Sequence, residues 1–169
     1  MNKIILLAIL FLGVIFGQAQ EYLIQINGST NVNEFKCKNN EFYFEDEHYN
    51  FLNKQLPDII LKSREFDCGN NIMTKDFQKT LQSQTYPNLH IKFLNFSKKE
   101  NSKYSAVVEV KMMNKTVKYN IEFAIMNGRL IGKETVKFSD FGIVPPKKMG
   151  GMIVVKDNLD LVFNMASKK

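Results

Sequence analysis

Few residues in this 169-residue chain have types and spacing that could do chemistry. His48 and His90 are the two histidines, Cys37 and Cys68 are the two cysteines, and neither cysteine has a histidine near it in sequence. His48 follows an acidic run that could bind a metal weakly, but no second cluster has metal-ligand spacing. The patterns GxSxG, GxGxxG and HExxH are absent from the sequence. We therefore predict no catalytic residue, no metal site and no cofactor, which indicates a protein that is not an enzyme.

Residues 1–19 have the pattern of a signal peptide. Lys3 precedes a 13-residue apolar run over 4–16, and the small residues Gly17 and Ala19 follow it. A run of this length is shorter than the about 20 residues that cross a bilayer, so an uncleaved anchor is the weaker alternative. We predict cleavage after Ala19 and a single mature domain over 20–169. The product is then exported, to the periplasm or outside the cell, and does not span the membrane.

Export bears on both the charge and the cysteines. The formal net charge is +6, but the basic residues are scattered as short pairs such as Lys98–Lys99. A secreted chain rarely meets nucleic acid, so these pairs indicate solvated surface and no nucleic-acid partner. An oxidising compartment permits a disulfide between Cys37 and Cys68, which are 31 residues apart in sequence. Such a bridge would stabilise the fold by about 3–4 kcal/mol, although the sequence alone leaves the pairing open.

Period-two alternation of apolar and polar residues dominates the mature chain and predicts half-buried antiparallel strands. It is clearest over 89–93, 104–112, 117–123 and 158–165. Asn127–Gly128 and Met113–Asn114–Lys115 stand between such runs and predict tight hairpin turns. Further strands are expected around 21–27, 32–38, 41–45, 59–66 and 130–138. Only Thr74–Ser83 has helical character, with Phe77 and Leu81 one turn apart.

About eight strands in 150 residues leave a sandwich or a closed barrel. Consecutive long hairpins favour the barrel, so we predict an all-β, eight-stranded antiparallel up-and-down barrel with one short helix. On pattern alone, its inward stripe predicts a packed core more readily than a ligand cavity. That stripe comprises Ile91, Phe93, Val108, Val110, Met112, Tyr119, Ile121, Phe123, Leu161 and Phe163.

Four stretches, in order, resemble the YceI-like family of periplasmic, lipocalin-like proteins. Residues 26–35 resemble the GTSxLHDW-type motif of one branch, with Asn33 and Phe35 where that branch has Asp and Trp. Residues 74–81, followed by 86–93, are similar to the family's helix and YPxIxF strand entry. The DFGIxPP-like block lies within 137–146, and 155–161 is similar to the closing strand. The cysteines are not part of this pattern.

The resemblance implies a barrel that encloses a long apolar tunnel and holds an amphiphile with an isoprenoid tail, such as a quinone or a polyprenyl derivative. The ten inward residues would then line the tunnel and bind the lipid. Each methylene that leaves water for an apolar wall contributes about 0.8 kcal/mol, so a chain can be held without special polar groups. The predicted role is transport, storage or sequestration of this lipid.

Two other functions remain as alternatives. The first is a barrel with a filled core that acts as an interaction module of the cell envelope through its loops at 46–57 and 145–151. A continuous void of a few hundred Å³ would favour the carrier, and a packed interior would favour the module. The second is an enzyme that acts on a bound lipid, for which Tyr119 and Glu134 are the titratable residues on predicted strands. The sequence also leaves a homodimer open.

Overall fold

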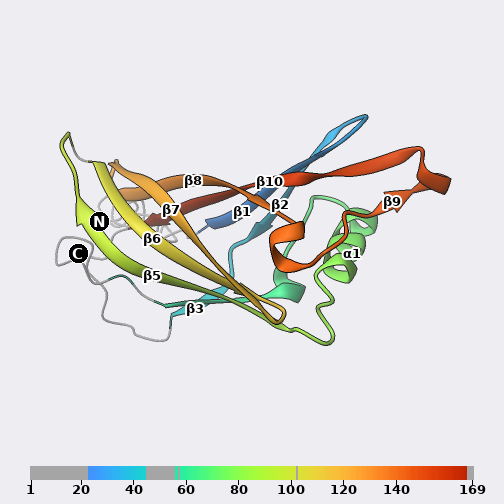
Figure 1. Ribbon diagram of the computed structural model, residues 1–169, viewed down its shortest axis with the longest axis horizontal. Coiled ribbons are helices and arrows are strands. Elements are labelled where there is room, and N and C mark those ends of the chain that lie inside the picture. The colour runs from blue at the N-terminus through green and yellow to red at the C-terminus, as the bar shows by residue number, and fades with distance from the viewer. Residues whose placement is uncertain (1–22, 45–55, 57, 102, 167–169) are drawn as a thin grey trace, which may run out of the picture.

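One curled antiparallel sheet forms the body of the protein in the computed structural model (Figure 1). The structure describes residues 23–44, 56, 58–101 and 103–166, so the predicted signal peptide, His48 and most of the loop at 46–57 lie outside the described residues. The strands are β1 (Leu23–Thr30), β2 (Glu34–Asn39), β3 (Phe42–Phe44), β4 (Ile59–Lys62), β5 (Asn88–Lys98), β6 (Lys103–Met112), β7 (Lys115–Met126), β8 (Arg129–Lys137), β9 (Lys147–Lys148) and β10 (Ile153–Ala166). The helices are α1 (Asn71–Thr80) and the short 3-10 turns η2 (Ser63–Glu65), η3 (Ser139–Phe141) and η4 (Met149–Gly151).

The strand order is that of an up-and-down barrel. Hydrogen-bonded neighbours run β2-β1-β10-β8-β7-β6-β5-β4-β3, and β9 pairs with the first residues of β10. The first strand therefore pairs with the last. Hairpins join β5 to β6, β6 to β7 and β7 to β8, whereas η2 and α1 lie between β4 and β5, and η3, β9 and η4 lie between β8 and β10. Eight of these strands have four or more residues, and α1 is the one α-helix in the described part of the chain. The predicted lipocalin-like all-β class is confirmed.

Alternation explains why these residues form strands. In β6, Tyr104, Ala106, Val108, Val110 and Met112 are all buried, and the residues between them are more exposed. The predicted turns are also present, since Met113, Asn127 and Gly128 have φ values of 54°, 51° and 72°. Positive φ at both turn residues 127 and 128 matches the right-handed twist of the flanking strands.

Three local features differ from the predictions. The helix begins at Asn71 rather than Thr74, because the Asn70 side chain accepts a hydrogen bond from the backbone N–H of Met73 (2.8 Å) and caps it. The strand expected over 59–66 ends at Lys62 and continues as η2. In β5 the pairing shifts between Leu94 and Ser97, and this irregularity turns Phe96 into the core.

A single bent segment joins the two edges of the sheet. β2 pairs with β1, and β3, which starts three residues after β2 ends, pairs with β4. The Asn39 side chain is fully buried at this bend. Its Nδ2 donates to the backbone carbonyl of Lys62 on β4 (3.1 Å), and its Oδ1 accepts from the backbone N–H of Glu41 (3.1 Å). The amide of Asn39 therefore links β2 to β4 across the bend and provides hydrogen-bond partners for backbone groups there.

The disulfide Cys37–Cys68 lies beside this bend and adds a covalent link between β2 and the loop before α1. The backbones of Lys38 and Asp67 also exchange hydrogen bonds of 2.8 and 2.9 Å. Both links act on the same place, so β2 is held on one side by β1 and on the other by the chain that leads into α1.

Replacing Asn39 by Ala should lower the free energy of unfolding by about 1–3 kcal/mol, because it removes the buried hydrogen bonds from the Asn39 side chain to the Lys62 carbonyl and from the Glu41 N–H to that side chain. Urea unfolding of the oxidised protein measures this. Asn40→Ala, at the exposed neighbouring position, is the matched control and should change stability little. Equal stability of the two variants would contradict the bridging role of Asn39.

Candidate functional site

The ten residues predicted to line a tunnel all face the interior of the curled sheet or border it. Eight of them are buried, whereas Phe93 and Tyr119 are half-buried. They do not form one continuous wall. Only Val110, Met112 and Leu161 border the inner cavity described below, and the others pack elsewhere.

Aromatic rings fill the part of the barrel near the β5–β6 end. Phe123 and Phe163 meet at a centroid distance of 5.5 Å, Phe93 lies 5.9 Å from Phe163, and Phe96 stacks on Tyr104 at 5.0 Å. Gly132 lies opposite Phe123 in the sheet, and a Cβ at this position would lie 2.3 Å from the ring. The glycine therefore makes room for this ring, and the interior here is packed.

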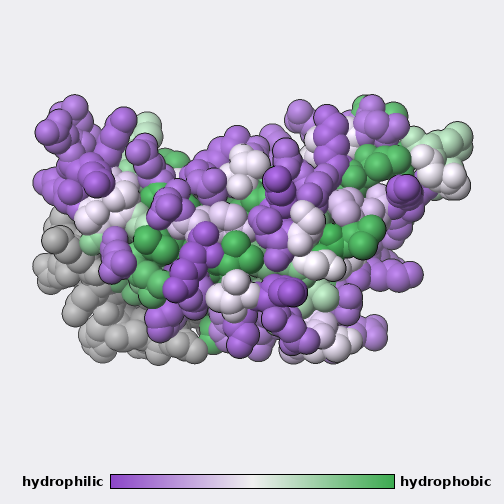
Figure 2. All heavy atoms as spheres, viewed as in Figure 1, coloured by the Kyte–Doolittle hydropathy of each residue, from purple (hydrophilic) through white to green (hydrophobic). Residues whose placement is uncertain are grey.

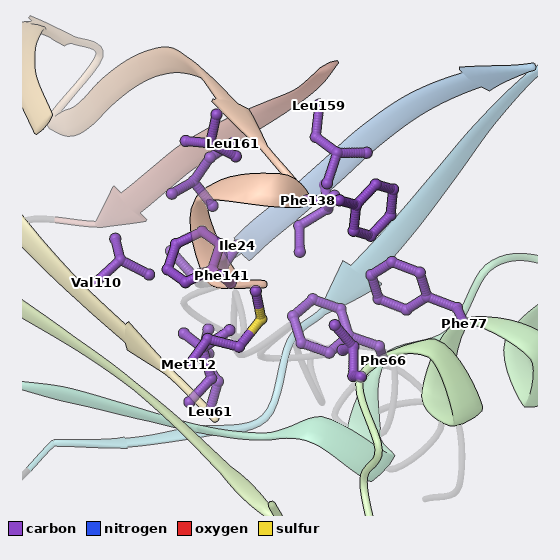
Figure 3. Close-up of a pocket in the computed structure, with 14 residues that line it drawn as sticks. Ile24, Leu61, Phe66, Phe77, Val110, Met112, Phe138, Phe141, Leu159 and Leu161 are labelled. Atoms are coloured by element: carbon purple, nitrogen blue, oxygen red, sulfur yellow. The ribbon is translucent and has the colours of Figure 1, made fainter. Parts of the chain in front are cut away.

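Toward the other end, an apolar cavity of about 30 Å³ remains inside the barrel. Figure 3 shows the side chains that surround it, with Val110 and Met112 from the sheet facing Phe138 and Phe141 from the segment after β8. Phe66 and Phe77 close it from the side of α1. A water molecule needs about 10–15 Å³ of such space. The cavity is therefore only about as large as two water molecules and is too small for an isoprenoid chain.

A much larger space lies just outside this cavity. It is an open cleft of about 470 Å³ between α1, the β1–β2 hairpin and the arm formed by β9, η4 and the start of β10. Its walls are mainly apolar, and Phe77 and Phe138 border both the cleft and the inner cavity. The cleft is lined by Thr30, Asn33, Phe35, Asn70, Ile72, Met73, Asp76, Phe77, Thr80, Phe138, Pro146, Lys148, Ile153 and Val155.

The helix wall of the cleft is fixed at several points. The disulfide holds Cys68, two residues before the Asn70 cap, and the Gln78 side chain donates to the carbonyl of Arg64 (2.8 Å). Phe77 packs edge-on against Phe66, with ring centroids 5.4 Å apart. The apolar side of α1 is therefore anchored to the barrel.

The arm on the opposite side is held by one asparagine and one ion pair. Asn31, in the β1–β2 turn, donates from its side chain to the carbonyl of Met152 and accepts from the N–H of Val154, both at 2.9 Å. Lys148 Nζ lies 2.6 Å from Asp76 Oδ1 on α1 and spans the cleft. Both partners are partly exposed, so this ion pair stabilises the position of the arm relative to α1 by at most about 1 kcal/mol.

The floor of the cleft depends on the segment 138–142 that follows β8. The backbone N–H of Ser139 donates to Asp157 Oδ1 (2.9 Å), and Ser139 Oγ donates to Asp157 Oδ2 (2.5 Å). The side-chain hydrogen bond, the larger of these two effects, holds the pKa of Asp157 below its ordinary value. Gly142 ends the turn at φ 71°, and Phe138 and Phe141 are thereby buried in the barrel end.

Tyr119 secures the same segment from β7. Its hydroxyl donates to Asp140 Oδ2 (2.9 Å), which also accepts from the backbone N–H of Lys137 (3.2 Å). Burial raises the pKa of Tyr119 far above its ordinary value, and the hydrogen bond to Asp140, that carboxylate's charge and the charge of Glu134 act in the same direction. Tyr119 therefore stays protonated as a donor, and the arrangement gives it a positioning role.

None of the ten residues that were predicted to line a tunnel lies in the wall of the cleft. Phe35, Phe77, Phe138 and Val155, which do line it, belong to the four stretches that carry the family resemblance. These stretches lie far apart in sequence but meet at one end of the barrel. The family resemblance was therefore the sequence signal that could have located the cleft. His90 lies on β5, half-buried, away from the cleft.

The described residues hold neither a metal-binding cluster nor a helix that could span a membrane. Among them, no group of three or more His, Cys, Asp or Glu side chains has an arrangement that could hold a metal ion. No helix in this part of the chain is both long and apolar enough to cross a membrane.

Comparison with solved structures identifies the architecture. Burkholderia cenocepacia BcnA matches with a TM-score of 0.72 and 13% identity, over 87% of this chain and 96% of that one. The Campylobacter jejuni YceI protein matches with a TM-score of 0.55 and 14% identity, over 76% of this chain and 85% of that one. The chain has the YceI-like fold. The predicted family resemblance is thus confirmed at the level of the fold.

A third structural neighbour is a polyisoprenoid binding domain from Saccharophagus degradans implicated in plant cell wall breakdown. It matches with a TM-score of 0.58 and 7% identity, over 87% of this chain and 94% of that domain. No protein-family model and no curated protein matches the sequence. Similarity to these solved structures therefore lies in the path of the backbone.

Replacing Tyr119 by Phe should lower stability by about 1.5–3 kcal/mol near neutral pH, because Asp140 loses a donor. A raised pKa favours the protonated phenol in the folded protein. Tyr119 therefore makes its full contribution to the free energy of unfolding below about pH 10, the ordinary tyrosine pKa. The contribution declines at higher pH, where the tyrosine of the unfolded chain ionises.

Urea unfolding at a series of pH values tests this. The difference in unfolding free energy between the original protein and Tyr119→Phe should be constant from about pH 7 to 9 and shrink from about pH 10 to 12. A difference that does not change over the whole range would contradict the hydrogen-bonded, protonated state of Tyr119.

Proposed function

We propose that this protein binds an apolar isoprenoid-type lipid, a quinone or a polyprenyl derivative, and carries, stores or sequesters it after export to the periplasm or outside the cell. The observation that supports this most directly is the cleft of about 470 Å³, whose floor residues Phe77 and Phe138 also border the cavity inside the barrel. Ligand sites of small molecules usually measure about 300–1,000 Å³. The lipid chain is proposed to lie in this cleft.

The chemistry of the walls suits such a chain. Met73, Ile153 and Val155 offer apolar contact on opposite sides of the cleft, and Phe35 and Phe77 offer flat ring surfaces. Each methylene buried there contributes about 0.8 kcal/mol without any directional bond. Polar groups occur at Asn33, Asn70 and the Lys148–Asp76 pair, where the head group of an amphiphile would find hydrogen-bond partners.

The proposed site continues inward past Phe77 and Phe138. A chain longer than the cleft would need these rings to change rotamer, and Met112 behind them is a flexible side chain that can adapt. Val110, Met112 and Leu161 would then contact the lipid, while the tighter aromatic cluster around Phe123 and Phe163 would limit its depth. The name of the Saccharophagus domain, which shares the fold, supports this ligand class.

The inner cavity of about 30 Å³ favours a second candidate function. A barrel whose core is already filled could serve as an interaction module of the cell envelope with no lipid ligand. Both candidates are binding proteins without a catalytic step. They differ in whether purified protein contains or takes up a lipid.

Organic extraction of the exported, purified protein followed by mass spectrometry separates the two candidates. Lipid carriage predicts a stoichiometric isoprenoid-bearing species in the extract, or uptake of added quinone by protein that was empty. An empty extract from folded protein that also takes up no added quinone would favour the filled module. Sequencing of the mature N-terminus in the same preparation tests cleavage after Ala19.

Met73→Glu should reduce lipid occupancy at least about tenfold, because the carboxylate would have to lose water against the bound chain. Met73 is half-exposed on α1, so the variant should fold. Asn71→Glu introduces the same charge on the same helix at an exposed position outside the cleft, and should retain the lipid. Occupancy is measured by quantitative mass spectrometry of the extract. Equal occupancy in both variants would place the lipid elsewhere.

A further inference from the structure

Exposed large apolar side chains gather at the cleft end of the molecule. In the described part of the chain there are six of them, and four lie around the cleft. Figure 2 shows apolar atoms among hydrophilic ones at the end where Figure 1 places α1 and β9. We name these four residues the apolar tip; they are Val32 (64% exposed), Ile72 (78%), Met149 (66%) and Met152 (66%).

Hydrogen bonds place the tip residues close together. Asn31, next to Val32, is hydrogen-bonded to the carbonyl of Met152, and the N–H of Met152 donates to the carbonyl of Met149 (3.3 Å). Ile72 lines the cleft with Lys148, which precedes Met149. The tip therefore consists of side chains from three separate segments that surround the cleft mouth. Single exposed apolar residues are common, but a group around one opening indicates a contact surface.

Basic residues accompany the tip. The three segments that carry it, 31–34, 71–80 and 144–153, contain four lysines and two acidic residues, so their net charge is 4 − 2 = +2. Lys148 pairs with Asp76, whereas Lys75, Lys79 and Lys147 have no ion-pair partner within the described residues. Apolar side chains bordered by lysines are typical of surfaces that insert shallowly into an anionic lipid interface.

We propose that the apolar tip docks on an anionic lipid bilayer, with Met149 and Met152 entering the region between head groups and acyl chains. Lys75, Lys79 and Lys147 then face the lipid phosphates. This orientation places the cleft mouth against the bilayer, so an apolar ligand could pass between membrane and cleft without crossing water. The ligand-transfer role rests on the proposed function, but the docking itself does not.

Co-sedimentation with vesicles tests the docking. The probe is equimolar phosphatidylglycerol and phosphatidylcholine, with pure phosphatidylcholine for comparison. The protein should bind the anionic vesicles more strongly, and added salt should weaken binding. Met149→Ser/Met152→Ser should lower the partition coefficient at least about tenfold, because two apolar side chains no longer leave water.

Met126→Ser is the matched control, because Met126 is also exposed (57%) but ends β7, away from the cleft. It should bind vesicles as the original protein does. Equal binding by the double variant and the original protein, or no binding by a folded original protein, would overturn the proposal. A dimer in sedimentation velocity that the double variant abolishes would instead assign the tip to contact with a second copy.

A second measurement separates this proposal from that of lipid carriage. The double variant should still take up a quinone supplied in dilute detergent-free solution, because its cleft is intact, but should acquire it from vesicles at least about tenfold more slowly. Vesicle binding without any quinone uptake would reject the proposed function and retain the docking. Quinone uptake without vesicle binding would reject the docking and retain the proposed function.

Discussion

The buried amide of Asn39 is the interaction on which the closure of this barrel depends. A strand that leaves one neighbour for another must bend, and bending exposes backbone groups that the sheet no longer pairs. The Asn39 side chain accepts from the Glu41 N–H in the link between β2 and β3 and donates to the Lys62 carbonyl at the end of β4. Because it spans the bend, β2 and β3 can serve opposite edges of the sheet, and α1 receives a fixed base through Cys68.

The two ends of the barrel differ in how tightly their side chains are packed. Between β5, β7 and β10, phenylalanine rings fill the interior, and Gly132 supplies the room that Phe123 needs. At the α1 end, the space is bounded by separate pieces of chain. The disulfide and ring packing anchor α1, whereas polar contacts attach the arm on the opposite side. An arm attached in this way can shift at small cost, whereas a close-packed core resists change. The cleft thus has one fixed wall and one adaptable wall.

Much of the fold was predictable from sequence, because strands with one buried face carry period-two alternation and their turns carry characteristic residues. The alternation in β6 and the Asn127–Gly128 turn are examples. The cleft was not predictable by that route, because it is built from a helix, a hairpin tip and an arm whose apposition is tertiary. The burial of Phe96 was not predicted for a local reason. The irregular pairing after Leu94 shifts the alternation, so that even-numbered rather than odd-numbered side chains of β5 face inward from there on.

Pairing of the first strand with the last has a consequence for synthesis of the chain. Ile24 lies opposite Phe163, so 163 − 24 = 139 residues separate two neighbours in the sheet. The β1–β2 hairpin emerges early, yet one of its edges has no partner until the last strand has been made. Contacts of such long sequence separation form slowly, and an unpaired edge invites association with other chains. Until β10 has been made, this edge of the nascent hairpin therefore lacks its native partner and is open to pairing with other chains.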